Sequence, residues 1–512
     1  MKTFLMYRQK DFSLDGALSP NSPDLIQDLA LEPIFQAMAN GDPFLLEVSK
    51  AALLSSMTSA DDILYRQRIL IDCLAYPSII REIYGISVQA IEREKKVWGW
   101  MSSRYPSGTL YRGVEVLEVF SALLKKLRQI AIENASGFRS DGFRRLFDMI
   151  GRELDQQYLN VVEEHLKRLK FPRGIVMTAE LGPRNKGTNY VLRKQSDEHG
   201  GWWERTQYWL EQIMGRNGSR LFYEIAERDQ AGSNALSELR DEGIRHVAAA
   251  LAESADHILS FFSTLRLELG FYLACLNLRD HLLTNGGPVS LPEPVPSGPA
   301  VICAQGIYDP SLSLTASARV VGNDVVANGK TLIIVTGANR GGKSTLLRSL
   351  GVAQLMMQAG MFVAARSFRA DIRMNVFTHF KREEDASMKS GKLDEELRRM
   401  TNIVDLLTPN SIVFFNESFA STNEREGSEI ARQIVQGMLD AGVKVVYVSH
   451  MYDLTYGFYS LNLTDALFLR AERLPDGQRT FRVSEGEPLP TSHGEDLYNQ
   501  IFCEEQEQGA NP

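Results

Sequence analysis

The chain has 512 residues, of which 44% are hydrophobic and 23% charged, and its formal net charge is −8. This composition excludes a disordered tail protein, a collagen and a small disulfide scaffold, and the length allows roughly two to four domains. The negative charge argues against a histone-like binder of nucleic acid unless a local basic patch overrules it.

Cysteine usage and hydropathy indicate a cytoplasmic protein. The four cysteines are scattered and form no CxxC pair, so neither a disulfide framework nor a zinc site is expected. The N-terminal apolar stretch is too short for a signal peptide, and no uninterrupted apolar run approaches the ~20 residues of a membrane helix. We therefore expect no membrane partner.

Two regions that differ in composition and hydrophobic pattern predict the fold class α + α/β. Residues 1–160 are rich in Leu, Ile, Ala, Glu and Arg, with few Gly or Pro, and predict an all-helical core domain. The Pro- and Gly-rich segment 286–300 cannot form a regular helix and is the expected linker. In residues 301–512, β-branched runs alternate with helical stretches, which predicts a mainly parallel sheet with helices on its faces.

Residues 161–200 differ from the helical sequence around them. Two β-like runs, Gly174–Leu181 and Asn189–Leu192, are separated by turn residues and predict a hairpin. Basic residues gather here, which favours contact with a phosphate backbone, although charge runs in general more often form a solvated surface. The candidate DNA contacts are Arg173, Arg184, Lys186, Arg193 and Lys194.

Residues 201–285 contain the strongest helical signal. Between 235 and 283, apolar residues recur mostly at steps of three and four. One unbroken helix of this length would extend roughly 70 Å and could act as a lever between distant sites. Two ordinary core helices, with a break at Gly243 or Gly270, are the alternative.

A phosphate-binding loop follows a buried strand in the second half. The run Thr331–Thr336 leads into GANRGGKST and then a helical stretch, which is GxxxxGK(S/T) in its required setting. Glycines let backbone N–H groups approach phosphates, and the helix N-terminus adds its positive dipole end. Lys343 can reach the β- and γ-phosphates, and the Ser344 hydroxyl can ligate Mg²⁺. The predicted ATP-binding residues are Gly337, Ala338, Asn339, Arg340, Gly341, Gly342, Lys343, Ser344 and Thr345.

Two further strands end in polar residues. Asn416 follows Ser411–Phe415 at the position where P-loop ATPases usually place an Asp ligand of Mg²⁺, so weaker metal affinity is expected. Glu417 comes next and can act as a general base toward water. Val443–Val448 leads to His450, which should face the ligand crevice and could sense the γ-phosphate. The candidate catalytic residues are Glu417, His450 and Lys343, and the candidate metal ligands are Ser344 and Asn416.

These motifs carry a family resemblance. GANRGGKST is similar to the GPNMGGKST loop of the MutS DNA mismatch-repair ATPases, NESFASTNEREG to their DEIGRGTSTYDG, and SHMYDL to THYFEL. Asn323 also lies where the family often has Asn-Asp, and residues 24–95 resemble its helical core. The resemblance implies an ABC-like ATPase on a helical core with levers, and ATP and Mg²⁺ as cofactors. It further implies DNA held by helical arms and a homodimer in which the partner chain completes each ATP site.

Three departures from the family pattern affect the predicted function. Asn416 replaces Asp, which leaves the hydrolysis rate open. The family's partner-contacting Ser-Thr signature is not evident in Ser387–Leu397, where only Ser390 and Gly391 could stand in. The chain begins at the helical core, so direct mismatch reading is not expected.

Two functions stay open at this level. The first is an ATPase clamp of the MutS type, slow and DNA-modulated, that acts in repair or recombination. The alternative is an ATP-binding switch or scaffold with very weak hydrolysis, which Asn416 favours. An SMC-like or transporter-type ATPase is less favoured, because it would need long coiled coils or a membrane partner. The preferred DNA structure and any repair-protein partners cannot be read from the sequence.

Overall fold

The structure, a computed structural model, describes residues 1–490 apart from 17, 20, 99–104, 173, 184–186, 194–229, 299, 317–318, 383–390 and 475–476. The chain forms two compact units, each built from several stretches of sequence. The first unit comprises Met1–Lys2, Glu82–Ser136 and Leu146–Arg266, and the second comprises Thr3–Arg81, Gly137–Arg145 and Leu267–Pro512. The segment expected as a linker lies inside the second unit, and the predicted domain boundaries stay predictions.

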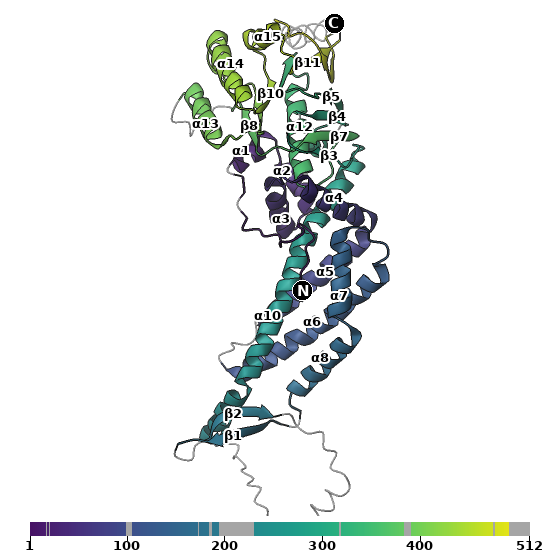
Figure 1. Cartoon of the computed structure of the whole chain (residues 1–512), viewed down its shortest axis with the longest axis vertical. Coiled ribbons are helices and arrows are strands. Elements are labelled where there is room, and N and C mark those ends of the chain that lie inside the picture. The colour runs from purple at the N-terminus through teal and green to yellow at the C-terminus, as the bar shows by residue number, and fades with distance from the viewer. Residues whose placement is uncertain are drawn as a thin grey trace, which may run out of the picture. The chain divides into compact units, whose positions relative to one another are not determined.

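All regular secondary structure in the described residues of the first third of the chain is helical (Figure 1). They are α1 (Ser22–Asp28), α2 (Glu32–Ala39), α3 (Pro43–Leu54), α4 (Ala60–Ala75), α5 (Pro77–Trp98), α6 (Pro106–Asn134), α7 (Asp141–Glu153) and α8 (Gln156–Leu169). Proline occupies the first turn of α1, α2, α3 and α6, where its missing N–H costs no hydrogen bond. The side chains of Asp42, Ser59 and Asp155 cap α3, α4 and α8. The helical start predicted from the sequence is therefore confirmed.

Helix α10 (Gln230–Thr284) is continuous over 55 residues. The alternative of two helices with a break at Gly243 or Gly270 is therefore wrong. A Cβ at Gly243 would lie 2.0 Å from the sulfur of Met177, so this glycine permits close packing instead of a break. Part of α10 is apolar enough to span a membrane by length and composition, but most of that part is buried, as in the core helix of a water-soluble protein.

The hairpin expected in the basic segment is present. Strands β1 (Val176–Leu181) and β2 (Gly187–Arg193) pair antiparallel, with Met177 opposite Leu192. Leu192 also packs, within the first unit, on a small core that includes Leu110 of α6 and Ile244 of α10. The hairpin is thus anchored by apolar contacts to the helices of its own unit.

A mainly parallel sheet of six strands dominates the second unit, as the sequence predicts. Its strands are β6 (Leu332–Gly337), β8 (Val376–Phe380), β9 (Ile412–Asn416), β10 (Lys444–Val448), β11 (Ala466–Arg473) and β12 (Arg479–Glu485). They lie in the order β12-β11-β6-β10-β9-β8, and only the edge strand β12 is antiparallel to its neighbour. Strand β6, which leads into the phosphate-binding loop, therefore lies in the interior of the sheet.

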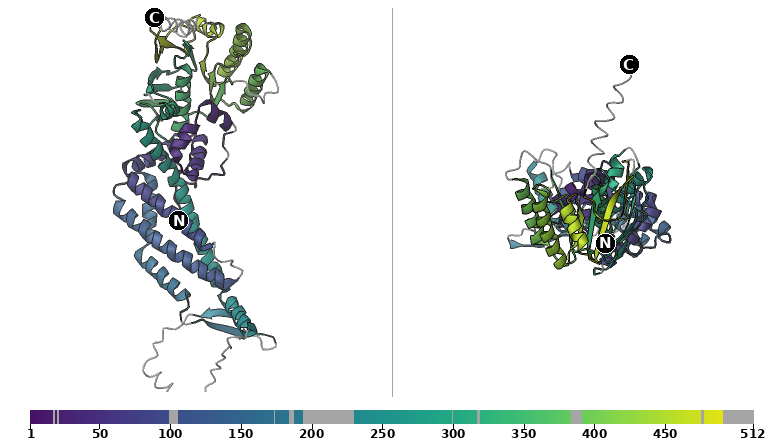
Figure 2. Two further views of the ribbon diagram at one scale, coloured as in Figure 1. Left: turned by 180° about the vertical axis from the view of Figure 1, so that it is seen from behind. Right: turned by 90° about the horizontal axis from the view of Figure 1, so that it is seen from above.

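Helices cover both faces of this sheet (Figure 2). Ile334, Phe415 and Tyr447 pack with α13 (Lys392–Leu406), α14 (Glu424–Asp440) and α15 (Tyr452–Ser460). Alternate residues of the same strands point to the other face, where α12 (Lys343–Gln358) packs against β6, β9 and β10. Because both faces are covered, the strands read as continuous apolar runs, and this made them recognisable in the sequence.

A second, four-stranded sheet was not predicted. Its strands β3 (Glu293–Val295), β4 (Ile302–Ile307), β5 (Asn323–Val326) and β7 (Ser367–Asp371) lie in the order β3-β7-β4-β5, with α11 (Pro310–Thr315) between β4 and β5 in sequence. The segment 286–300 is indeed not helical, but it contributes β3, which pairs parallel to β7. Strands this short, paired with distant residues, leave little periodicity to detect.

Candidate nucleotide-binding site

Glycines shape the loop that follows β6. The strand is buried through Thr336, and Gly337 then takes φ +104°, where a Cβ would lie 2.9 Å from the backbone nitrogen of Ala471. Gly342, with φ +90°, is the N-cap of α12. Residues with side chains rarely adopt these angles, so both ends of the loop require glycine. The loop consequently lies at the N-terminus of α12, the end of a helix that favours anions.

The loop surrounds the ammonium group of Lys343. This side chain is 5% exposed and donates hydrogen bonds to the carbonyls of Gly337 (2.9 Å) and Ala338 (3.0 Å). Burial lowers the pKa of Lys343, the charge of Arg479 lowers it further, and the carboxylate of Glu417 raises it. Phosphate oxygens would give this buried cation both acceptors and opposite charge.

The two candidate metal ligands meet at the start of α12 and the end of β9. The Ser344 hydroxyl donates a hydrogen bond to Oδ1 of Asn416 at 2.8 Å. Adjacent ligands of an octahedral Mg²⁺ ion lie about 2.9 Å apart, so the spacing of these oxygens fits that ion. Both groups are neutral, and the described residues contain no cluster of three acidic, His or Cys side chains that could hold a metal. Bound Mg²⁺ would therefore depend on nucleotide phosphates for negative charge.

The two other catalytic candidates also lie together. The Glu417 N–H donates to the Val448 carbonyl at 2.9 Å, which ties the ends of β9 and β10. Oε1 of Glu417 lies 4.0 Å from Nδ1 of His450, and the two side chains are 33% and 40% exposed. A carboxylate and an imidazole thus face water side by side at the C-terminal edge of the parallel strands.

Buried polar groups hold the turn after β9. Nδ1 of His379 in β8 lies 2.8 Å from the Ser418 hydroxyl, and its Nε2 lies 3.0 Å from the Glu396 carbonyl. A carbonyl can only accept, so Nε2 carries the proton. Burial, and next the charge of Arg399, lowers the pKa of His379 to about 4. The Tyr447 hydroxyl donates to the Ser418 carbonyl at 2.7 Å, which fixes the turn from the opposite side.

One cleft of about 400 Å³ unites most of these residues. Among the residues selected from the sequence, those that line it are Asn339, Arg340, Gly341, Gly342, Lys343, Ser344, Thr345 and Glu417. The other four predicted ATP-binding, metal and catalytic residues lie one contact away: Gly337 and Ala338 accept from Lys343, Asn416 accepts from Ser344, and His450 lies beside Glu417.

Two family models match this chain. The MutS2 N-terminal domain matches residues 58–285, and MutS domain V matches residues 333–488, which contain the cleft's loop and strand ends. The chain belongs to the MutS family.

Relatives match the chain over shorter stretches. The DNA mismatch repair protein MutS of Porphyromonas gingivalis is 34% identical over 146 residues, which are 28% of this chain and 16% of that protein. Endonuclease MutS2 is 32% identical over 151 residues in Lacticaseibacillus casei and 33% identical over 159 residues in Listeria monocytogenes. These stretches are 29% and 30% of this chain, and 19% and 20% of the respective relatives. The chain therefore spans about a fifth or less of the length of these relatives.

An apolar wall of the MutS-family cleft was missed from the sequence. It comprises Leu312, Ala316, Val320, Val321 and Phe481, with Arg319 beside them. The side chain of Asn323 donates to the Phe481 carbonyl at 3.1 Å and accepts from the Val483 N–H at 2.9 Å, so it fastens β12 over the cleft. The available signal was Asn323, which lies ahead of the strand that leads into the loop, whereas Phe481 lies too far along the chain to be inferred.

The candidate DNA contacts of this MutS-family chain are only partly described. Arg193 ends β2, is exposed, and donates from Nε to the Thr178 hydroxyl at 3.0 Å. Its other nitrogens face no described carboxylate, which leaves room for a phosphate contact. Arg173, Arg184, Lys186 and Lys194 lie outside the described residues, as do Ser387–Ser390 of the expected partner-contacting stretch.

Proposed function

We propose that this MutS-family chain is a cytoplasmic, DNA-binding clamp that hydrolyses ATP in an ABC-like domain and acts in DNA repair or recombination. We further propose a homodimer in which the partner chain completes each ATP site. One observation supports ATP hydrolysis most directly: the Lys343 ammonium, the Ser344–Asn416 oxygen pair and the Glu417 carboxylate converge on one cleft. Family membership supports DNA as the partner.

The proposed chemistry assigns one task to each group. The loop and Lys343 bind the β- and γ-phosphates, and the apolar wall with Val321 and Phe481 faces the base. Glu417 accepts a proton as water attacks the γ-phosphorus, and the bond to the β-phosphate oxygen breaks. His450 orients Glu417 from its side. Ser344 and Asn416 would hold Mg²⁺, which when bound neutralises charge on the phosphates.

One observation favours a second candidate, an ATP-binding switch or scaffold with very weak hydrolysis. The oxygen pair of Ser344 and Asn416 carries no charge, so the site attracts Mg²⁺ less strongly than a site with Asp. A slow ATPase would spend longer in its ATP-bound state. The cleft geometry needed for binding is the same in both proposals, so turnover and its response to DNA separate them.

The test of the clamp is a panel of ATP turnover measurements without DNA and with duplex, mismatched, branched or single-stranded DNA. We expect Mg²⁺-dependent turnover that changes about fivefold or more with at least one of these DNAs, the size of a typical coupling between sites. A chain with all five candidate basic residues of 161–200 reversed in charge should lose that response. ATP binding without turnover in any arm would support the switch and contradict the clamp.

Asn416→Asp separates slow from fast hydrolysis. We expect turnover to rise on the order of tenfold, with half-saturation at lower Mg²⁺, because a carboxylate restores negative charge at the metal position. Asn423→Asp is the matched control, since Asn423 caps α14 and Asp caps a helix equally well. Equal turnover in Asn416→Asp and the parent chain would show that Asn416 does not set the rate.

A further inference from the structure

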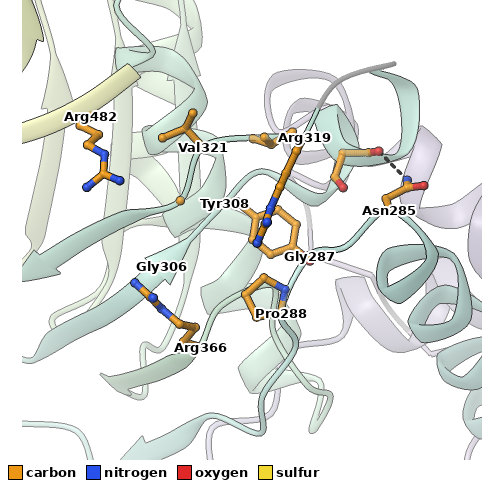
Figure 3. Close-up of a pocket in the computed structure, with 12 residues that line it drawn as sticks. Asn285, Gly287, Pro288, Gly306, Tyr308, Arg319, Val321, Arg366 and Arg482 are labelled. Carbon is orange, nitrogen blue, oxygen red and sulfur yellow. Dashed lines mark hydrogen bonds between the residues drawn. The ribbon is translucent and has the colours of Figure 1, made fainter. Parts of the chain in front are cut away.

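A second pocket adjoins the nucleotide cleft. It measures about 320 Å³ and shares only Arg319, Val320 and Val321 with the lining of that cleft. Three arginines from different parts of the second unit line it: Arg319 before β5, Arg366 before β7 and Arg482 in β12 (Figure 3). Figure 3 shows their guanidinium groups directed toward the same space beside Gly306. We call this space the arginine pocket.

Positive charge in the arginine pocket is poorly neutralised. Within the described part of the chain, neither Arg319 nor Arg482 has a carboxylate within ion-pair distance. Arg366 lies 3.7 Å from Asp324, with both side chains 66% exposed, so this pair is weak. The same Asp324 oxygen accepts the Gly306 N–H at 2.6 Å. Among the described residues, therefore, only one of the three cations has a carboxylate nearby, and that carboxylate is partly occupied.

The inner wall of the arginine pocket contributes a buried donor. Tyr308 is 3% exposed, and its hydroxyl has no hydrogen-bond partner among the described residues. Gly287, which also lines the pocket, lies so close that a Cβ there would be 2.3 Å from this hydroxyl. A buried hydroxyl without a partner costs about 1–3 kcal/mol, so an acceptor beside it would be stabilising.

We propose that the arginine pocket binds a small anion that carries phosphate groups, such as pyrophosphate. Guanidinium forks pair with phosphate oxygens through two parallel hydrogen bonds, and three forks from different elements suit several oxygens at once. The Tyr308 hydroxyl adds a neutral donor. The volume holds one or two phosphate groups and is too small for a nucleic-acid duplex. This proposal does not depend on whether the chain hydrolyses ATP.

Calorimetric titration of the full chain with pyrophosphate and with orthophosphate tests this site. The loop of Lys343 could itself bind either anion, so the titrations use Lys343→Ala as the background. We expect pyrophosphate binding to persist there, and to weaken about tenfold when Arg482→Gln or Arg319→Gln is added. Tyr308→Phe should weaken it severalfold, because it removes one hydrogen bond and leaves the wall otherwise intact.

The matched control is Arg432→Gln, an exposed arginine on α14 that pairs with Glu429 and should leave the affinity unchanged. Loss of all binding in Lys343→Ala, or equal affinity in every arginine variant, would overturn the proposal. Tighter binding of a 5′-phosphorylated single-stranded DNA than of pyrophosphate, lost in the same variants, would also overturn it in favour of a DNA end. The substituted arginine side chains are exposed, and circular dichroism checks that each variant, including the Lys343→Ala background, is folded.

Discussion

Glu417→Gln is expected to lower ATP turnover by about 10²–10⁴-fold while ATP stays bound. Glutamine keeps the shape of the side chain but cannot accept the proton of the attacking water. The loop, Lys343 and the apolar wall are unchanged, so nucleotide affinity should stay within a few-fold of the parent. Steady-state phosphate release measures turnover, and equilibrium dialysis with ATP measures binding.

Glu429→Gln is the matched control for this prediction, because Glu429 lies on the exposed face of α14 and, among the described residues, has Arg432 and Gln433 as its hydrogen-bond partners. It should turn over ATP like the parent. Turnover of Glu417→Gln within a few-fold of the parent would show that another group takes the proton. His450→Ala should have a smaller effect than Glu417→Gln, since His450 lies 4.0 Å from the carboxylate and acts through it.

Local chemistry explains which parts of the fold the sequence revealed. The loop between β6 and α12 needs glycine at Gly337 and Gly342, and its strand is a continuous apolar run, so both were predicted within one residue. Asn416 and Glu417 were found for the same reason, because they end a buried strand. The mainly parallel character of the sheet followed the general rule for alternating strands and helices, whereas β8, β11, β12 and the strand order were not predicted.

Non-local pairing explains what the sequence did not reveal. Strand β3 has three residues and depends on β7 for its existence. Phe481 reaches the cleft from β12, which pairs with β11 and whose Phe481 carbonyl accepts a hydrogen bond from Asn323. Helix α10 was left undecided because Gly243 is a poor helix former, yet the helix continues through this glycine, where Met177 packs closely. In each case a distant partner decides the local structure, and a single sequence does not identify that partner.

The turn after β9 shows how buried chemistry positions the candidate base. Glu417 and Phe419 take φ +54° and +61°, each a strained conformation for a residue with a side chain, at about 1–3 kcal/mol. Between them, Ser418 contacts His379 and Tyr447, and His379 stacks on Phe419 with ring centroids 5.1 Å apart. These contacts offset the strain. His379 is thus a positioning residue for the carboxylate.

The neutral state of His379 predicts that the second unit loses stability in mild acid. The pKa of His379 falls from 6.5 to about 4 on folding, mainly through burial. Between pH 6.5 and 4, the imidazole of His379 is therefore protonated in the unfolded chain but stays neutral in the folded chain. The contribution of His379 to the free energy of unfolding is fully present above pH 6.5. It is lost as the pH falls toward 4, which lowers the free energy of unfolding by about 3 kcal/mol.

His379→Gln isolates this contribution, because glutamine keeps a donor and an acceptor but does not titrate. We expect His379→Gln to be less stable than the parent at pH 7.5, since it loses the imidazole stacking and hydrogen-bond geometry. The difference in free energy of unfolding between the parent and His379→Gln should shrink steadily between pH 6.5 and 4, because only the parent loses the histidine contribution. Urea unfolding followed by circular dichroism at each pH measures both chains. Parallel pH profiles would show that folding leaves the pKa of His379 unchanged, and this result would contradict a neutral, buried imidazole.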